Sequence, residues 1–211
     1  MDIAKKIDHT MLKPEAGKDV VLRYCQEARE HGFASVCVNS VYVPLVKKSL
    51  EGSDVKVCSV VGFPLGAMSK RAKAFEAKCA VEDGADEIDM VIHIGALKDG
   101  DFQAVEEDIR AVVEASAPAL VKVIVETCLL TKEEIKKACQ LSEQAGAAFV
   151  KTSTGFSTGG ATLEDIRLMK ASVSSKMQIK ASGGIRTKAF AEELLESGAD
   201  RIGAGNGMLL L

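Results

Sequence analysis

The chain has 211 residues, 47% of them hydrophobic, and a formal net charge of -3 at pH 7. This length and apolar content allow one sizeable core, so we expect a single domain over residues 1–211. Basic and acidic residues are interspersed without a basic stripe, which argues against a nucleic-acid partner, and no stretch approaches the roughly 18 apolar residues of a membrane span.

Hydrophobic periodicity divides the chain into alternating strands and helices. Residues 3–10 contain a short predicted strand that ends in Asp8-His9-Thr10, and residues 20–32 form a predicted helix that stops at Gly32. The strands predicted after it are 33–38, 55–63, 85–92, 120–126, the stretch that leads from Phe149 into Lys151, 177–182 and 199–205. The helices predicted between them are 43–52, 69–84, 102–115, 131–145 with a capping box from Thr131 to Glu134, 162–173 and 187–197.

One local pattern supports this division, because EHGFASV, EDGADEI, QAGAAFV and ESGADRI each place a glycine between a helix and an apolar strand. Apolar strands that alternate with amphipathic helices predict a parallel sheet covered by helices. Eight such units favour a single α/β domain with the TIM (β/α)8 barrel fold, whose last helix is abbreviated because only NGMLLL follows the final strand. An open doubly wound sheet is the alternative, disfavoured because no G-x-G-x-x-G follows an early strand.

The first ten residues, MDIAKKIDHT, hold no apolar core long enough for a signal peptide, so we expect a cytoplasmic location. Six cysteines are scattered without a CxxC pair, which favours reduced and largely buried thiols in that compartment. The histidines, His9, His31 and His93, form no ligand pair on one element, so no metal site is expected.

The stretch FVKTSTGF, Phe149–Phe156, combines an apolar strand, one lysine and a turn of small hydroxylated residues. Lys151 is either a lysine that snorkels to the surface or a buried amine whose charged form is disfavoured, which would make it a nucleophile. The strand 177–182 places Lys180 at the corresponding point. Because adjacent parallel strands lie about 4.8 Å apart, two inward lysines at matching heights would bring their amines together.

At roughly 4 Å and an effective dielectric constant near 20, two ammonium groups repel each other by about 4 kcal/mol, or nearly three pKa units. We therefore expect the pair to share its charge, with one lysine neutral and the other an ammonium. Asp89 lies between apolar residues in EIDMV. It is either a structural salt-bridge partner of one lysine or a carboxylate that balances the pair and moves protons.

Small residues and glycines follow the last three predicted strands, and Arg186 adds a positive charge to them. The candidate substrate-binding residues here are Thr154, Gly155, Gly183, Gly184, Arg186, Gly203, Gly205 and Asn206. Glycine lets backbone N–H groups approach an anion, and phosphate commonly binds in the loops after the last strands of a barrel. Turn chemistry alone would explain any one of these glycines, but three loops at one end of a barrel favour a phosphate site.

The motifs EIDMVI, FVKTSTGF, IKASGGIR and RIGAG together resemble those of the deoxyribose-phosphate aldolases, class I aldolases with a TIM-barrel fold, and the resemblance covers nearly the whole chain. It implies reversible cleavage of 2-deoxy-D-ribose 5-phosphate to D-glyceraldehyde 3-phosphate and acetaldehyde. Lys151 would form the Schiff base, Lys180 would tune it and Asp89 would relay protons, with no cofactor. The resemblance also implies that Asp8, Thr10 and Cys37 line the substrate pocket.

The chain departs from this family where Gly205-Asn206 stands in place of two hydroxylated residues, and where it ends in three leucines without the final tyrosine of some members. The first departure leaves open a Schiff-base aldolase that acts on another phosphorylated sugar. A non-catalytic barrel whose lysines hold an anion is a further alternative, although it gives Asp89 no use. A homo-oligomer, dimer or tetramer, is compatible with the sequence.

Overall fold

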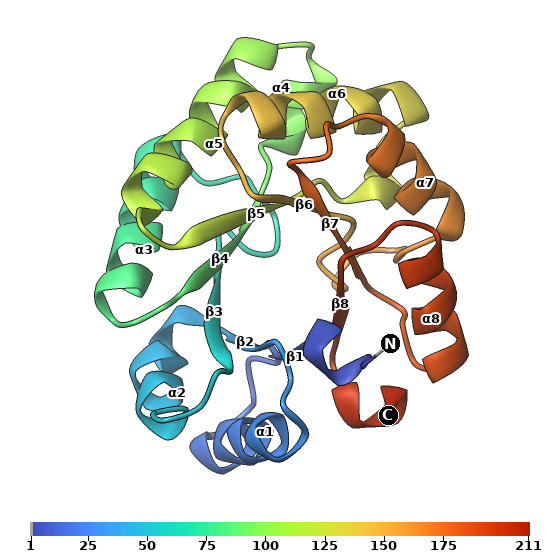
Figure 1. The fold of residues 1–211 in the computed structure, drawn as a ribbon. Coiled ribbons are helices and arrows are strands. Elements are labelled where there is room, and N and C mark those ends of the chain that lie inside the picture. The colour runs from blue at the N-terminus through green and yellow to red at the C-terminus, as the bar shows by residue number, and fades with distance from the viewer. Residues whose placement is uncertain (1) are drawn as a thin grey trace.

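The computed structural model describes residues 2–211 and contains one closed barrel of parallel strands, in which β8 pairs with β1. Helices surround the barrel, so the predicted TIM-barrel fold is confirmed (Figure 1). The strands are β1 (Ile7–Met11), β2 (Ser35–Val38), β3 (Lys56–Val61), β4 (Glu87–Val91), β5 (Leu120–Ile124), β6 (Phe149–Lys151), β7 (Gln178–Ser182) and β8 (Arg201–Ala204).

The predicted helices are present, with ends shifted by a few residues. They are α1 (Lys18–His31), α2 (Val43–Ser49), α3 (Lys70–Glu82), α5 (Phe102–Ser116), α6 (Lys132–Gln144), α7 (Leu163–Ala171) and α8 (Lys188–Glu196). The short elements that were not predicted include the helix α4 (Ile94–Lys98) and the 3-10 turns η2 (Ser40–Tyr42) and η3 (Thr127–Leu129). Within residues 2–211, no helix is both long and apolar enough to cross a lipid bilayer.

Local signals in the sequence explain several of these boundaries. Gly32 ends α1 in the left-handed region, with a φ of 66°, and its N–H bonds back to the carbonyl of Ala28. At the start of α6, the Thr131 side chain accepts the N–H of Glu134, while the Glu134 carboxylate accepts the N–H of Thr131. The predicted capping box is therefore confirmed.

The two ends of the chain lie beside each other and close the barrel. The prediction of a strand from residue 3 is wrong for its first part, because Ala4–Lys6 forms the 3-10 turn η1 and β1 begins at Ile7. The predicted abbreviated last helix is confirmed: in the described part of the chain, β8 is followed by the 3-10 turn η4 (Gly207–Leu210) and not by a longer helix.

Strand alternation separates an apolar shell from a charged barrel interior. On β4, Ile88 and Met90 are fully buried in the hydrophobic core, whereas Glu87 and Asp89 contact lysines of β5, β6 and β7. A barrel interior is usually filled by branched apolar side chains. Charged groups at these positions therefore mark the interior as the place to look for chemistry.

Candidate active site

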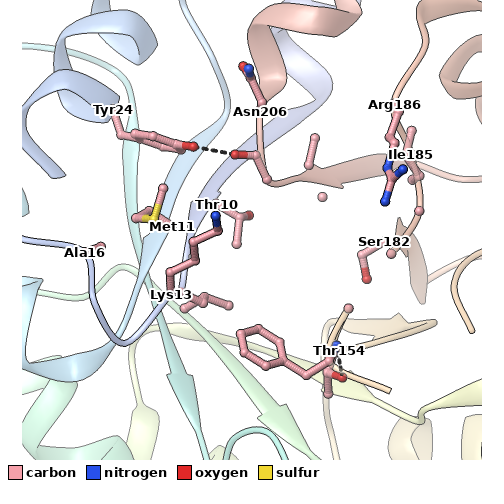
Figure 2. Close-up of a pocket in the computed structure, with 18 of the residues that line it drawn as sticks. Thr10, Met11, Lys13, Ala16, Tyr24, Thr154, Ser182, Ile185, Arg186 and Asn206 are labelled. Carbon is pink, nitrogen blue, oxygen red and sulfur yellow. Dashed lines mark hydrogen bonds between the residues drawn. The ribbon is translucent and has the colours of Figure 1, made fainter. Parts of the chain in front are cut away.

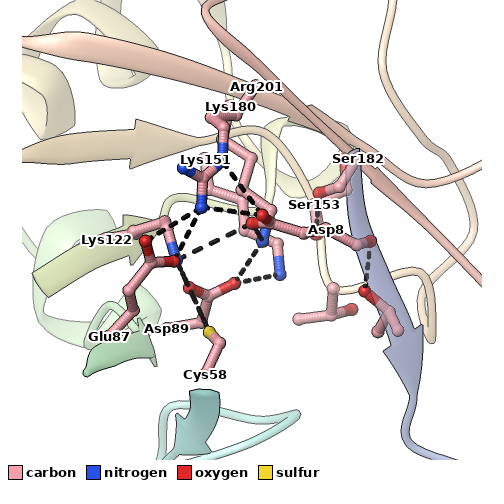
Figure 3. Close-up of polar contacts among 12 residues, drawn as sticks. Asp8, Cys58, Glu87, Asp89, Lys122, Lys151, Ser153, Lys180, Ser182 and Arg201 are labelled. Carbon is pink, nitrogen blue, oxygen red and sulfur yellow. Dashed lines mark hydrogen bonds and ion pairs between the residues drawn. The ribbon is translucent and has the colours of Figure 1, made fainter. Parts of the chain in front are cut away.

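Three lysines converge on one carboxylate inside the barrel (Figure 3). Asp89 Oδ2 accepts hydrogen bonds from Nζ of Lys151 and Nζ of Lys180, each at 2.8 Å, and Asp89 Oδ1 accepts one from Nζ of Lys122, also at 2.8 Å. Lys151 and Lys180 are direct register partners on β6 and β7. Because both amines lie on the same oxygen, they are no farther apart than twice that distance, and the predicted close pair is present.

A second ring of charges surrounds this centre (Figure 3). The Lys180 amine lies 2.5 Å from Asp8 Oδ2, and the Lys122 amine donates to Glu87 Oε2 at 2.5 Å. Arg201 from β8 joins the two sides, because its guanidinium donates to Asp8 Oδ1 at 2.9 Å and to Glu87 Oε2 at 2.8 Å. Each carboxylate of the interior is thus shared by at least two cations.

Lys122, Glu87 and Arg201 were missed by the sequence reasoning. The signal for Lys122 was present, since it interrupts the apolar strand LVKVI as Lys151 and Lys180 interrupt theirs. Glu87 lies two residues before Asp89 and therefore shares its face of β4. Arg201 carried a weaker signal, because a cation at the first position of a strand usually reaches solvent.

The interior holds more cations than carboxylates. Lys122, Lys151, Lys180 and Arg201 face Asp8, Glu87 and Asp89, and the three lysines and three carboxylates are all buried. If every group were charged, one positive charge would remain without a carboxylate in a site removed from water, which is costly. Loss of one proton from one lysine balances the cluster.

The local contacts show which groups of the cluster keep their charge. Burial raises the pKa of Asp89, but Lys122, Lys151 and Lys180 outweigh it and hold that pKa well below its usual range. Burial also lowers the pKa of Lys180, yet Asp8 and Asp89 prevail and raise it above its ordinary value; Lys122 shifts in the same direction. Simple repulsion between two lysines is therefore an incomplete account, because carboxylates stabilise the charge of Lys180.

A cavity of about 840 Å³ opens at the carboxyl ends of β1, β6, β7 and β8 (Figure 2). Among the four cations of the cluster, Lys151 lines this cavity, whereas Lys122, Lys180 and Arg201 do not. The cavity wall also carries positive charge from Lys13, Arg23 and Arg186, against the single acidic side chain of Glu15. An anionic ligand with a group that reaches Lys151 fits this distribution.

The predicted substrate-binding residues fall into two groups. Those that line the cavity are Thr10, Thr154, Gly155, Gly183, Gly184, Arg186, Gly203, Gly205 and Asn206. Asp8 and Cys37 do not, because both are fully buried inside the barrel. Asp8 belongs to the ion cluster, and Cys37 packs with Leu12 and Cys58. The expectation that Asp8 and Cys37 line the pocket is therefore wrong, because both lie deeper in the barrel than the cavity wall.

Gly203 in β8 and Gly205 directly after it are glycines for different structural reasons. A Cβ on Gly203 would lie 2.9 Å from Ser182 Cβ and 3.0 Å from Lys180 Cε, so this glycine makes room for the buried lysine. A Cβ on Gly205 would meet nothing within 4 Å and Gly205 does not have a left-handed φ. Neither packing nor backbone strain requires glycine at 205, and the open space beside it belongs to the cavity.

Glu126, which the sequence reasoning did not select, holds the loop after Lys151. Its backbone has a φ of 59° and a ψ of 64°, a left-handed conformation that is uncommon outside glycine. Its buried carboxylate accepts the N–H of Thr154 at 3.2 Å and the Thr154 hydroxyl at 2.5 Å. A strained backbone conformation of this kind persists only where the surrounding structure holds it in place. Here the strained residue Glu126 in turn holds Thr154, a residue of the cavity wall.

Cys37, Cys58 and Asp89 offer ligand atoms that lie within 4.8 Å of one another, as a metal site would require. The electrostatics do not fit a cation, because the ammonium groups of Lys122, Lys151 and Lys180 already surround the carboxylate. The Cys58 thiol donates to Asp89 Oδ1 at 3.2 Å, and burial together with its neighbours raises its pKa well above the ordinary value. It is better described as a hydrogen-bond donor to Asp89.

A buried lysine on a carboxylate at the floor of a barrel cavity is the arrangement that a barrel aldolase working through an amine needs. Within that class, the chain belongs to the DeoC/LacD family of aldolases, whose sequence model matches residues 3–211. It is 59% identical to the deoxyribose-phosphate aldolase of Finegoldia magna, over 100% of this chain and 99% of that protein. It is 60% identical to that of Streptococcus pneumoniae serotype 19F, over 100% and 96%.

Solved structures agree with this assignment. The tetrameric deoxyribose phosphate aldolase from Aeropyrum pernix superposes with a TM-score of 0.92 at 34% sequence identity, over 99% of this chain and 88% of that one. The similarity therefore extends over nearly the whole barrel.

Proposed function

We propose that this protein is a class I aldolase that reversibly cleaves 2-deoxy-D-ribose 5-phosphate to D-glyceraldehyde 3-phosphate and acetaldehyde through a Schiff base on Lys151. One observation carries the proposal: of the cations gathered around Asp89, Lys151 is the one that lines the cavity, and it shares a carboxylate oxygen with a second lysine. The names and high identities of the bacterial relatives support the choice of substrate.

The neutral amine of Lys151 attacks the substrate aldehyde at C1, and loss of water from the carbinolamine gives a protonated imine. Removal of the proton from the C3 hydroxyl then breaks the C2–C3 bond, and its electron pair forms an enamine with the imine carbon. D-glyceraldehyde 3-phosphate leaves, the enamine is protonated at C2, and water releases acetaldehyde. No step requires an external oxidant or reductant.

Lys180 and Asp89 have complementary roles in this proposal. Lys180 remains an ammonium because Asp8 and Asp89 stabilise its charge, and it shares Asp89 Oδ2 with the Lys151 amine. Asp89 Oδ2 accepts from both amines and so provides a path for protons between them. Because the pKa of Asp89 lies well below its usual range, this carboxyl carries a proton only transiently.

The phosphate binds in the loops after β7 and β8, where Gly183, Gly184 and Gly205 bring the backbone to the cavity. An added Cβ at Gly184 or Gly205 would meet nothing within 4 Å, so both positions leave room for a ligand. Arg186 supplies positive charge. Asn206 lines the same region, although its side-chain oxygen accepts the N–H of Met208 and is committed to the start of η4.

Reductive trapping tests the imine. Incubation with 2-deoxyribose 5-phosphate and borohydride should add one covalent adduct in the intact mass spectrum, and peptide mapping should place it on Lys151. Lys151→Met should give no adduct, and a chelator should leave wild-type turnover unchanged. Turnover that is lost with chelator and leaves no adduct would reject this mechanism.

Two comparisons separate this function from its rivals. Wild-type turnover should be much lower for 2-deoxyribose than for its 5-phosphate, and lower for other phosphorylated aldoses and ketoses than for 2-deoxyribose 5-phosphate. A preference for another phosphorylated sugar would assign a different substrate to the same site. Tight binding of inorganic phosphate without any retro-aldol turnover would instead indicate a non-catalytic barrel.

We further propose that the protein works in the cytoplasm as a homo-oligomer. Six free cysteines, most of them buried, suit a reducing compartment. Val41, Leu65 and Phe75 are large apolar side chains that are largely exposed in one chain, and a second copy would cover such side chains. Light scattering of the purified protein should give the mass of a dimer or tetramer, and a monomer at micromolar concentration would contradict the assembly.

A further inference from the structure

His9 occupies a buried position behind the cavity that the proposed chemistry does not use. It follows Asp8 on β1 and faces outward from the barrel, where it is fully buried. Its ring stacks on the ring of Tyr24 from α1, with centroids 4.0 Å apart and planes 16° apart. Phe33 packs against it at a tilt, 5.1 Å away. The imidazole is therefore held in one orientation by its neighbours.

Both nitrogens of this ring have partners, and these partners fix the tautomer. The backbone N–H of Gly207 donates to Nδ1 at 3.1 Å, so Nδ1 carries no proton. Nε2 lies 2.7 Å from Glu27 Oε2 and therefore carries the proton that it donates to this carboxylate. Glu27 thus orients the ring so that Nδ1 points at the start of η4.

The absence of a side chain at Gly207 allows this contact. A Cβ at this position would lie 3.1 Å from His9 Nδ1 and 2.7 Å from Ile7 Cγ2, and only glycine allows the backbone to come so close without movement. Gly207 begins η4 and is itself buried. The hydrogen bond from Gly207 thereby ties the end of the chain to β1.

Tyr24 holds the other side of the same turn. Its hydroxyl donates to the carbonyl of Gly205 at 2.5 Å, as the dashed line in Figure 2 shows. Gly205 and Asn206 line the cavity, and two contacts from the first βα unit therefore bracket them. The segment Gly205–Gly207, called here the β8 turn, is fixed by side chains that lie far from it in the sequence.

We propose that His9 is a positioning residue for anion binding: together with Tyr24, and oriented by Glu27, it holds the β8 turn in the conformation that receives the substrate phosphate. This inference rests on the proposed function, because it takes the β8 turn to be part of the phosphate site. His9 acts through Gly207 and does not line the cavity. Its loss therefore weakens binding of the phosphate and leaves the imine chemistry of Lys151 intact.

The test compares phosphorylated and free substrate in three variants. His9→Leu removes the acceptor for the Gly207 N–H and should raise KM for 2-deoxyribose 5-phosphate about tenfold, with kcat changed less than about twofold. His9→Asn keeps an acceptor near the Nδ1 position and should recover part of the loss. Tyr24→Phe keeps the stacked ring and removes one hydrogen bond, so about a threefold rise is expected. kcat/KM for free 2-deoxyribose should stay constant in both His9 variants.

His31→Leu is the matched control, because His31 is an exposed histidine at the end of α1 that stacks on Phe33 and makes no hydrogen bond to the β8 turn. It should change neither parameter. Equal losses for phosphorylated and free substrate, or an unchanged KM in folded His9→Leu, would overturn the inference. Affinity for inorganic phosphate, measured by calorimetry, should fall in parallel with the rise in KM. If the wild type fails to cleave 2-deoxyribose 5-phosphate, the proposed function fails, while the phosphate affinities still decide the role of His9.

Discussion

Two groups of buried lysines and carboxylates in this protein differ in charge ratio and in access to the cavity. Between α3 and α5, Lys73 Nζ donates to Asp108 Oδ2 at 2.6 Å and to the carbonyl of Val91 at 2.9 Å. Inside the barrel, four cations face three carboxylates, and Lys151 lines a large cavity. Burial of a lysine is therefore not by itself a sign of catalysis. An excess cation beside a cavity is the informative feature.

The outer pair has a structural explanation that needs no ligand. It joins α3 and α5 to the carboxyl end of β4, the strand that carries Asp89. Burial lowers the pKa of Lys73 and raises that of Asp108, and each partner opposes the shift of the other. The pair contains one cation and one carboxylate, so its charges cancel and neither side chain is left unpaired for a substrate.

The substitution Lys151→Met should give the largest difference in kcat between the two groups of charges. Loss of the nucleophile should lower kcat at least about ten-thousandfold, as expected when a covalent step is removed. The fold should remain, because Asp89 keeps Lys122 and Lys180 as partners. The matched variant Lys73→Met, assayed where it is folded, should retain kcat within a few-fold. Coupled assay of D-glyceraldehyde 3-phosphate release measures both, and more than about 0.01% residual kcat without Lys151 would contradict its assigned role.

The outer pair should dominate in a stability measurement. Lys73→Met leaves the Asp108 carboxylate buried without its cation, and its Oδ1 already lacks a hydrogen-bond partner. We expect the free energy of unfolding to fall by about 3–5 kcal/mol. The double variant Lys73→Met/Asp108→Leu removes both charges and should recover most of this loss. Urea denaturation measures each variant, and equal destabilisation of the single and double variants would show that the buried charge is not the cause.

The sequence predicted the part of this molecule that depends on local pattern. Helix-ending glycines, the capping box at Thr131 and the apolar strands gave the barrel. Lysines at equivalent points of two successive strands gave the Lys151–Lys180 pair, which the register confirms. Neighbouring strands of a parallel barrel are also neighbours in sequence order, so even this contact between strands is nearly local.

Contacts between residues far apart in the sequence could not be predicted from local patterns. Arg201 and Glu87 meet across the barrel although they lie on β8 and β4. Asp8 and Cys37 were placed on the pocket wall by family resemblance, and their height along the strand puts them behind it. The His9–Gly207 contact joins the first strand to the last turn. Periodicity in one sequence predicts which face of a strand a residue occupies. It does not predict which side chain of another element lies opposite that residue.

Stability at low pH should show the same contrast between the two groups of charges. The expected effect is smaller than that of the substitutions above, and Asp8 and Asp108 should change the free energy of unfolding in opposite directions. Lys180, Lys122 and Arg201 outweigh burial and lower the pKa of Asp8 below its ordinary 3.8, so the unfolded chain binds the proton first. Stability from Asp8 is therefore complete above about pH 4 and is lost as the pH falls below it. Asp108 has the opposite sign, since burial raises its pKa and the folded protein binds that proton first.

Urea unfolding across about pH 2.5–5 should therefore distinguish two isosteric variants. Asp8→Asn should reduce the slope of the free energy of unfolding against pH by up to one proton, about 1.4 kcal/mol per pH unit, in the acid part of the range. Asp108→Asn should leave that slope unreduced, because the folded wild type binds this proton at a higher pH than the unfolded chain does, so Asp108 makes no positive contribution to the slope. The slope is the readout since it does not depend on how much either substitution destabilises the protein. Identical slopes for the wild type and Asp8→Asn would mean that the barrel cations do not hold Asp8 ionised.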